Sequence, residues 1–501
     1  TTVNTFSPLI FRPNPGVYNV LVPTQLQRSL QVHRRASEPC EDFYQFSCGN
    51  FLQNTNLDNR GRDRSSTSWK GRNSIEIRNM LERPTQPQDP MAFNLAKKFY
   101  RSCMNESAIE AEGFKNIKQV FRQMGGWPTL EGSNWRREEF DWKEAVYKLR
   151  GMGANFDFFF RVSVDRDKKD GSRYILGAHH MLQTEEEVFD IVEDDPSTST
   201  REIARQVKIH DNVYSPSELR SDVKAMYLDY MVNVALLFGV GASTARKDAE
   251  EVLGLLLKIA KISEESTALN RSDLYEVYSV LELHVKYRTI PWLHHLNKLL
   301  EPVGTVGLDD MVVIAEPLYM SRLEMLLEDT PKRTLANYIV WHTLQHLINY
   351  SPAKLLDTAY FFIEKVNGKI TKPSRWKMCV KATEERMESV ISTAYIKNYF
   401  DEVTQDRALD LIRNIKTQFK YNLYAMQWLD KKTKDVILKK LISTSEEIVS
   451  YDYLTEALEE NRIYDKVQVH EGKLLESALN LDYVNTNIRF SKLMKPYKRT
   501  G

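Results

Sequence analysis

The stretch NLAKKFYRSCMNESAI, from Asn94 to Ile109, decides which kind of fold this chain can adopt. Its apolar residues Leu95, Phe99 and Cys103 recur every four positions, which is the spacing of one face of an α-helix. The same period returns along most of the chain, so the sequence predicts a mainly α protein with a large multi-helix lobe. The clearest further helical segments are residues 218–239, 243–269, 273–285, 316–328, 332–350, 352–366, 377–399, 403–425 and 431–442.

One small β element interrupts the helices. Residues 155–163 (NFDFFFRVS) are rich in aromatic side chains and predict a strand, and residues 173–176 are a candidate partner strand. Residues 1–38 contain four prolines and little apolar periodicity. This composition predicts an extended N-terminal arm.

The chain carries almost no net charge. Its 69 Lys and Arg residues face 68 Asp and Glu residues, for a net charge of +1, so we expect neither nucleic acid nor an anionic membrane as a partner. No apolar run approaches the ~20 residues of a membrane-spanning helix, and we expect no membrane span in this chain. Residues 1–4 lack the features of a signal peptide. We expect that any signal peptide or anchor was removed or lies outside the chain.

The chain has four cysteines, Cys40, Cys48, Cys103 and Cys379, and no Cys-x-x-Cys pair that would favour a zinc knuckle or a thioredoxin-type site. One interpretation is four buried thiols in a cytosolic protein. Asn-x-Ser/Thr triplets weigh against it, since they are glycosylation signals of secreted proteins. The candidate glycosylation sites are Asn105, Asn270 and Asn349.

Cys40 and Cys48 do not suit each other as disulfide partners. If the segment between them is helical, they lie about 12 Å apart at ~1.5 Å per residue. A disulfide needs Cα atoms within ~7 Å. Each of the two cysteines therefore needs a partner elsewhere.

The segment from Cys40 to Gly49, CEDFYQFSCG, resembles the corresponding segment of the neprilysin family of zinc endopeptidases. A second specific match joins Tyr100–Glu106 (YRSCMNE) with Gly126–Pro128 (GWP). Together with weaker matches in the family's order, the resemblance covers residues 35–495. The weaker matches are Ile290-Pro291-Trp292, Glu316-Pro317-Leu318-Tyr319, Asn337 to Trp341, Trp376 with Cys379, and Trp428-Leu429-Asp430 with Thr433.

The resemblance implies a pairing for the cysteines. In the family, the cysteine like Cys103 bonds the one like Cys379, so the resemblance implies that disulfide here. The cysteines like Cys40 and Cys48 bond cysteines of a C-terminal catalytic domain. We expect that thermolysin-like zinc domain to be absent from this chain, which leaves Cys40 and Cys48 without their family partners.

The resemblance also implies a domain organisation. After the arm of residues 1–38, residues 39–84 would pack against a catalytic domain. Residues 85–442 would form a helical cap lobe. Residues 443–501 would be a linker segment toward the missing catalytic domain.

The histidines do not supply a zinc site. The family's chemistry needs His-Glu-x-x-His on a helix, in which the Glu activates the zinc-bound water. His342 and His346 have the required spacing, but Thr343 stands in place of the Glu and cannot act as a general base. His470-Glu471 lacks the second histidine. We therefore expect no catalytic residue, no metal ligand and no cofactor in this chain, and zinc only if a catalytic domain is supplied.

A basic stretch supplies candidate peptide contacts. Arginines of the corresponding region contact the peptide in neprilysin relatives, and Arg62 and Lys70 are the best matches. Ser66 and Ser68 stand where the family has bulkier residues. A solvated basic loop is the interpretation that we favour over a working subsite.

Three hypotheses follow for the function. The first is a neprilysin-like cap without catalysis, a pseudoenzyme that encloses or binds short peptides. The second is the N-terminal part of an active zinc metalloendopeptidase whose zinc domain lies beyond residue 501 or in a separate C-terminal catalytic chain. The third is a purely structural or adhesive module, and no feature of the sequence supports it. We expect a secreted or extracellular location, and a homodimer if the inner face of the cap is exposed and apolar.

Overall fold

The computed structural model describes residues 38–46 without 39 and 43, 69–180 without 169, 221–267, 276–368, 372–446 without 445, and 461–495. Contacts divide the chain into one unit before Ile77 and a second, much larger unit from Ile77 onward. The sequence placed this boundary at residues 84/85. The helix α3 spans Trp69–Glu82.

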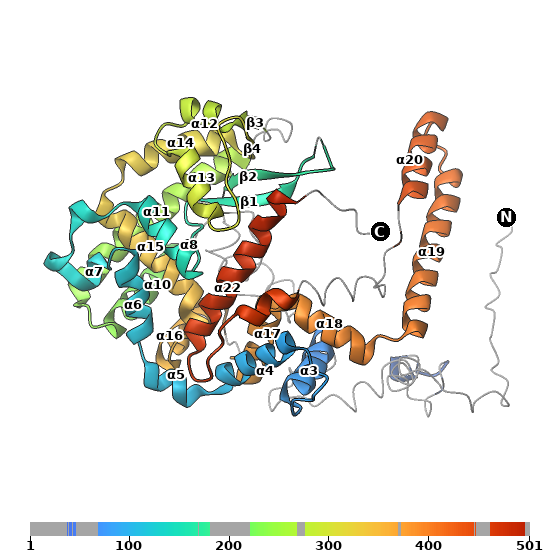
Figure 1. The fold of residues 1–501 in the computed structure, drawn as a ribbon, viewed down its shortest axis with the longest axis horizontal. Helices are drawn as coiled ribbons and strands as arrows, with labels where there is room; N and C mark the ends of the chain where they lie inside the picture. Colours follow the sequence, from blue (N-terminus) through green and yellow to red (C-terminus); the bar gives the residue numbers. More distant parts are fainter. Residues whose placement is uncertain are drawn as a thin grey trace. The chain divides into compact units, whose positions relative to one another are not determined.

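The larger unit is mainly helical, as the sequence predicts (Figure 1). No helix among the described residues is both long enough and apolar enough to cross a membrane. After α3 the α-helices are α4 (Met91–Met104), α5 (Glu106–Glu112), α6 (Lys115–Met124), α7 (Pro128–Glu131), α8 (Trp142–Met152), α10 (Ser221–Leu237), α11 (Ala242–Thr267), α12 (Val280–Lys286), α13 (Trp292–Leu300), α14 (Pro317–Asp329), α15 (Lys332–Leu347), α16 (Ala353–Asn367), α17 (Arg375–Arg386), α18 (Glu388–Tyr399), α19 (Glu402–Ala425), α20 (Lys431–Ser443) and α22 (Leu474–Ser491).

A four-stranded sheet in the order β1-β2-β4-β3 is the β element. β1 (Phe160–Arg166) and β2 (Tyr174–His180) are antiparallel, β4 (Met311–Ile314) runs parallel to β2, and β3 (Glu276–Ser279) is antiparallel to β4. The predicted strand 155–163 begins five residues late. The Asn155 side chain accepts from the Asp157 N–H at 3.3 Å and donates to its carbonyl at 3.2 Å, which forms a turn there.

Two predicted helices have different boundaries in the structure. Within residues 273–285, β3 precedes α12 because Ser279 and Glu282 form a capping box: the Glu282 N–H donates to the Ser279 hydroxyl at 3.2 Å and the Ser279 N–H to the Glu282 carboxylate at 2.7 Å. Within residues 377–399, the backbone leaves the helical conformation at the buried Met387, which separates α17 from α18.

The helix α15 lies at the centre of the lobe. Thirteen of its sixteen residues are buried, on all sides of the helix. Its aromatic side chains bond to neighbouring elements: the Trp341 indole donates to the Tyr227 hydroxyl at 2.8 Å, and the Tyr338 hydroxyl donates to the carbonyl of Phe158 at 3.0 Å. Burial of this kind is typical of a core helix rather than of an amphipathic surface helix.

A disulfide joins Cys103 of α4 to Cys379 of α17, the two cysteines that the resemblance pairs. Their Cα atoms are 5.6 Å apart and 276 residues apart in sequence. Arg375 donates from Nε to the carbonyl of Cys103 at 2.8 Å, so the same two helices are also held by a hydrogen bond. Cys40 is exposed and free, while Cys48 lies outside the described residues.

The segment 443–501, expected to be a linker, contains a core helix. α22 lies beside α8 and β1 (Figure 1) and buries Leu474, Leu481 and Phe490 among others. Gly153 permits this close approach: a Cβ there would lie 2.0 Å from the carbonyl oxygen of Leu479, and its φ of +78° favours glycine. Residues 461–495 therefore belong to the helical lobe.

Polar contacts from distant segments hold α22 in place. Arg386 donates to Asp482 at 2.8 Å, and Asn485 donates to the carbonyl of Arg386 at 2.8 Å. The buried Arg150 of α8 bonds the side chain of Asn487 and the carbonyl of Leu299, the latter at 3.0 Å. Burial lowers the pKa of Arg150 to about 10, which still leaves it charged at neutral pH.

The carboxyl of Glu384 on α17 is largely buried and binds its proton more tightly than an ordinary glutamate does. Burial raises its pKa to about 7, and the charges of Glu385 and Glu388 add to the rise. The ordinary value for a glutamate is 4.5. The folded state therefore binds this proton more tightly than the unfolded state does, and the stability that this supplies is lost as the pH rises toward 7.

Replacing either member of the buried disulfide should destabilise the lobe. We expect Cys103→Ser to lower the free energy of unfolding by about 3–5 kcal/mol, because a loop of this length loses its constraint in the unfolded state. Chemical denaturation followed by circular dichroism measures the change. Cys40→Ser, made in the 501-residue chain in which Cys40 is free, is the matched control and should leave stability unaltered; equal stability of both variants would contradict the disulfide's role.

Glu384→Gln should remove a pH dependence of stability. The variant mimics the protonated carboxyl, so its stability relative to the unmodified protein should increase by about 1–2 kcal/mol between about pH 4 and pH 8, less than the full pKa shift would give because water partly reaches the group. Thermal and urea unfolding at both pH values measure this difference. Glu364→Gln, at an exposed position on α16, is the control, and its stability relative to the unmodified protein should not change with pH. If the stability difference between Glu384→Gln and the unmodified protein is the same at both pH values, burial does not keep Glu384 protonated.

Candidate functional site

Of the two histidines with zinc-ligand spacing, His342 lies in the core and His346 is half-buried. His342 on α15 is buried, with its ring centroid 4.2 Å from that of Tyr338 and 6.3 Å from that of Phe158. Thr343 is fully buried, and its hydroxyl lies 4.0 Å from the sulfur of Met124. A catalytic zinc ion needs an open position for water, so these residues do not fit one.

In the part of the chain that the structure describes, no three His, Cys, Asp or Glu side chains are grouped so that they could hold a metal ion. His470 precedes a turn that packs against the C-terminal part of α4. Its carbonyl accepts a hydrogen bond from the Ser102 hydroxyl at 2.9 Å, and Glu471 pairs with Arg101 at 2.8 Å.

A buried Ser-His-Glu group is the nearest approach to a catalytic arrangement. The hydroxyl of Ser263 lies 3.2 Å from Nδ1 of His180, and Nε2 of His180 lies 3.7 Å from a carboxylate oxygen of Glu316. The backbone N–H of His180 also donates to Glu316, at 3.1 Å. No local motif in the sequence marks these three residues as a group.

This group acts as a structural junction. All three side chains are almost completely buried, so a substrate carbonyl has no access to the hydroxyl of Ser263. Burial lowers the pKa of His180 to about 4, which keeps it neutral at pH 7, and burial raises the pKa of Glu316. The bonds connect the end of β2 to α11 and to the start of α14.

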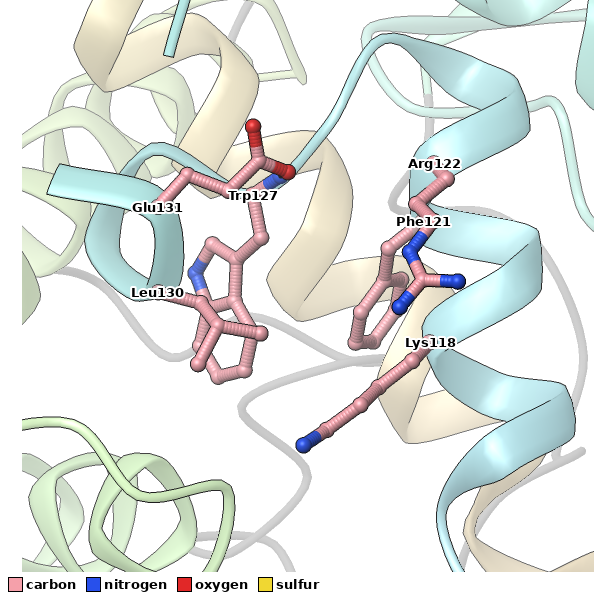
Figure 2. A pocket seen from close by; sticks show the side chains of 6 residues that line it. All are labelled: Lys118, Phe121, Arg122, Trp127, Leu130 and Glu131. Carbon is pink, nitrogen blue, oxygen red and sulfur yellow. The ribbon is translucent and has the colours of Figure 1, made fainter. Parts of the chain in front are cut away.

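A pocket of about 450 Å³ opens between α6 and α7 (Figure 2). Phe121 and Trp127 supply its aromatic surface, with ring centroids 5.4 Å apart in an edge-to-face arrangement. Both rings are buried. The remaining lining residues are Leu130 and Glu131 from α7 and Lys118 and Arg122 from α6.

The wall formed by α7 is fixed by α15. Asn337 accepts hydrogen bonds from the backbone N–H and the hydroxyl of Thr129, at 3.2 and 2.8 Å. Arg333 donates to the carbonyl of Pro128 at 3.2 Å and pairs with Asp248 at 2.6 Å. The short α7 is therefore anchored to the centre of the lobe.

The turn before α7 depends on glycine. Gly126 has a φ of +87°, and a Cβ there would lie 2.6 Å from the carboxylate of Glu131. This carboxylate accepts the backbone N–H of Trp127 at 3.1 Å. The Gly-Trp-Pro motif thus sets the position of the indole ring in the pocket.

The other site residues singled out in the sequence are only partly described. Arg62 and Asn270 lie outside the described residues, and of Lys70 only the backbone, in α3, is described. Asn105 is exposed between α4 and α5, where its side chain accepts from the N–H of Ala108 at 3.1 Å. Asn349 is half-buried, and the hydroxyl of Ser351, two residues on, is buried.

Known sequences match most of the chain. The profile of peptidase family M13 matches residues 39–452. Neprilysin-2 of Drosophila melanogaster is 26% identical over 485 residues, which make up 92% of this chain and 58% of that protein. Endothelin-converting enzyme 1 of Bos taurus is 24% identical over 466 residues, again 92% and 58% of the two chains. The chain thus spans 58% of the length of each of these relatives.

Solved structures share the fold. A zinc metalloprotease of Mycobacterium tuberculosis in its open state has a TM-score of 0.65 at 16% identity, over 92% of this chain and 66% of that chain. PepO of Lactobacillus rhamnosis has a TM-score of 0.63 at 14% identity, over 92% of this chain and 67% of that chain. Identities this low support a shared fold and nothing finer.

Proposed function

The chain belongs to peptidase family M13, as its resemblance to the neprilysin family predicted, and from this premise we propose that it is the helical part of a zinc metalloendopeptidase. The zinc-binding part would lie beyond residue 501 or in a separate chain. The helical lobe would enclose the cleft and restrict the substrates to short peptides. In such an enzyme Arg62 and Lys70 would be the candidate peptide contacts, with a solvated basic loop as the interpretation that the sequence favours.

One observation carries the proposal: the hairpin of α19 and α20 buries almost nothing. Of the described residues in these two helices, only Leu423 is buried. Leu411, Ile415 and Phe419 of α19 recur every four residues and are 60%, 59% and 44% exposed. An apolar stripe of this length is typical of a surface that another structural part covers.

The zinc-binding part is the occupant that we propose for this stripe. The chain spans little more than half of its relatives, and its own 501 residues contain no His-Glu-x-x-His motif. The exposed Cys40 agrees with this, because a secreted protein seldom leaves a thiol without a partner. The interpretation as a cap without catalysis gains no support from the relatives, since those whose names state an activity are enzymes.

The disulfide and the exposed triplet at Asn105 support a proposed extracellular location. Disulfides persist in oxidising compartments, and the side chain of Asn105 is accessible to a glycosyltransferase. A homodimer through the α19–α20 hairpin is the competing use of the same apolar stripe.

Mapping the disulfides of the native protein tests the proposal. We expect non-reducing mass spectrometry to join Cys40 and Cys48 to cysteines outside residues 1–501, in a polypeptide that carries His-Glu-x-x-His and one equivalent of zinc. Free or mutually bonded Cys40 and Cys48 in a stable monomer without zinc would contradict it. A disulfide between two copies of this chain would favour the homodimer instead.

The hairpin stripe can be tested on the 501-residue chain alone. We expect this chain to self-associate, and the double variant Ile415→Asp with Phe419→Asp to shift it toward monomer, because two charges disrupt an apolar contact. Analytical ultracentrifugation measures the distribution. The control, Asn414→Asp with Lys420→Asp, alters exposed polar positions of the same helix and should leave it unchanged. The same distribution for both variants would show that the stripe is not an interface.

A further inference from the structure

The pocket between α6 and α7 combines an apolar floor with two cations on one wall. Lys118 and Arg122 are four residues apart, so they lie on the same face of α6. Figure 2 shows both side chains extending from α6 into the space opposite Trp127 and Leu130. The cationic groups and the indole ring thus face each other across the pocket.

These two cations have no acidic partner. Among the described residues, no carboxylate lies within ion-pair distance, 4.0 Å, of the half-buried Lys118 or of the exposed Arg122. Like charges one helical turn apart repel each other. An anion bound between them would relieve this repulsion.

The one acidic residue of the pocket is already engaged. Glu131 accepts the N–H of Trp127 at 3.1 Å and belongs to the opposite wall. Its charge would repel an anion from the α7 side, which fixes the orientation of a ligand: the carboxylate toward α6 and the apolar group toward the rings. Arginine is well suited to such a role, because its guanidinium matches a carboxylate with two parallel hydrogen bonds.

The apolar part of the pocket is large and rigid enough for a side chain. Trp127 packs edge-to-face against the buried Phe238 at 5.2 Å, and Phe238 lies 5.9 Å from Phe121. The aromatic cluster behind the pocket is therefore fixed on three elements, α6, α7 and the end of α10. A volume of about 450 Å³ accommodates an aromatic ring together with its carboxylate.

The geometry points to a binding site for an aromatic or bulky apolar carboxylate, held by Lys118 and Arg122 over Phe121, Trp127 and Leu130. This is the chemistry of a peptide's C-terminal residue and of a free aryl acid. The site goes beyond the proposed peptidase function, since it needs neither zinc nor catalysis.

Isothermal titration calorimetry with three probes tests the site. We expect N-acetylphenylalanine to bind and its C-terminal amide, which lacks the charge, to bind at least about tenfold more weakly. 3-Phenylpropionate separates the two sources of the ligand: equal affinity assigns the site to aryl acids in general, and weaker affinity to peptide C-termini. Equal binding of the acid and the amide, or no binding of either at millimolar concentration, would overturn the proposal.

Variants identify the groups that bind. Arg122→Gln and Lys118→Met should each weaken binding of the acid about tenfold, since each removes a charge-assisted contact. Lys115→Met, on α6 outside the pocket, is the matched control and should bind normally.

Leu130→Trp should abolish binding by filling the pocket while leaving both cations in place. Arg122 is exposed, so its replacement tests the site even if Leu130→Trp does not fold; unaltered binding by Arg122→Gln and Lys118→Met would refute the assignment.

Discussion

The helix α15 is buried on all its sides, and this burial constrains how its polar side chains and its neighbours are arranged. A polar side chain on such a helix costs about 1–3 kcal/mol if it is left without a hydrogen bond. Asn337 therefore holds Thr129, and Gln345 donates to the hydroxyl of Tyr230 at 3.2 Å. The same burial surrounds His342 with aromatic rings, which is why a zinc-like spacing in the sequence has no metal chemistry in the structure.

The hairpin of α19 and α20 is the opposite case. Both helices begin with an aspartate that caps the first turn: Asp401 accepts the N–H of Thr404 at 2.8 Å and Asp430 that of Thr433 at 2.9 Å. Local signals of this kind specify helices without tertiary packing. The apolar stripe on α19 is different, because Leu411, Ile415 and Phe419 are 44–60% exposed. Its presence is the observation on which we base the proposal that the chain is one part of a larger peptidase.

The differences between sequence-based expectation and structure have specific causes. The boundary at Ser279 carries a local signal, the capping box with Glu282, and could have been predicted. The helix α22 could not have been assigned to the core in the same way, because its apolar residues do not follow one face. Contacts with Arg150 and Arg386, more than ninety residues away in sequence, hold it in place.

The sequence by itself determined the helical class, the family and the absence of His-Glu-x-x-His, because these depend on residue type and on spacing along the chain. It also carried the two cysteines that the family resemblance pairs. Only the tertiary structure decided that His342 is a core residue, that α22 belongs to the lobe, and that Lys118 and Arg122 face Trp127 across a pocket. Those features depend on which distant segments meet, and burial and charge pairing are properties of the folded contacts rather than of the local sequence.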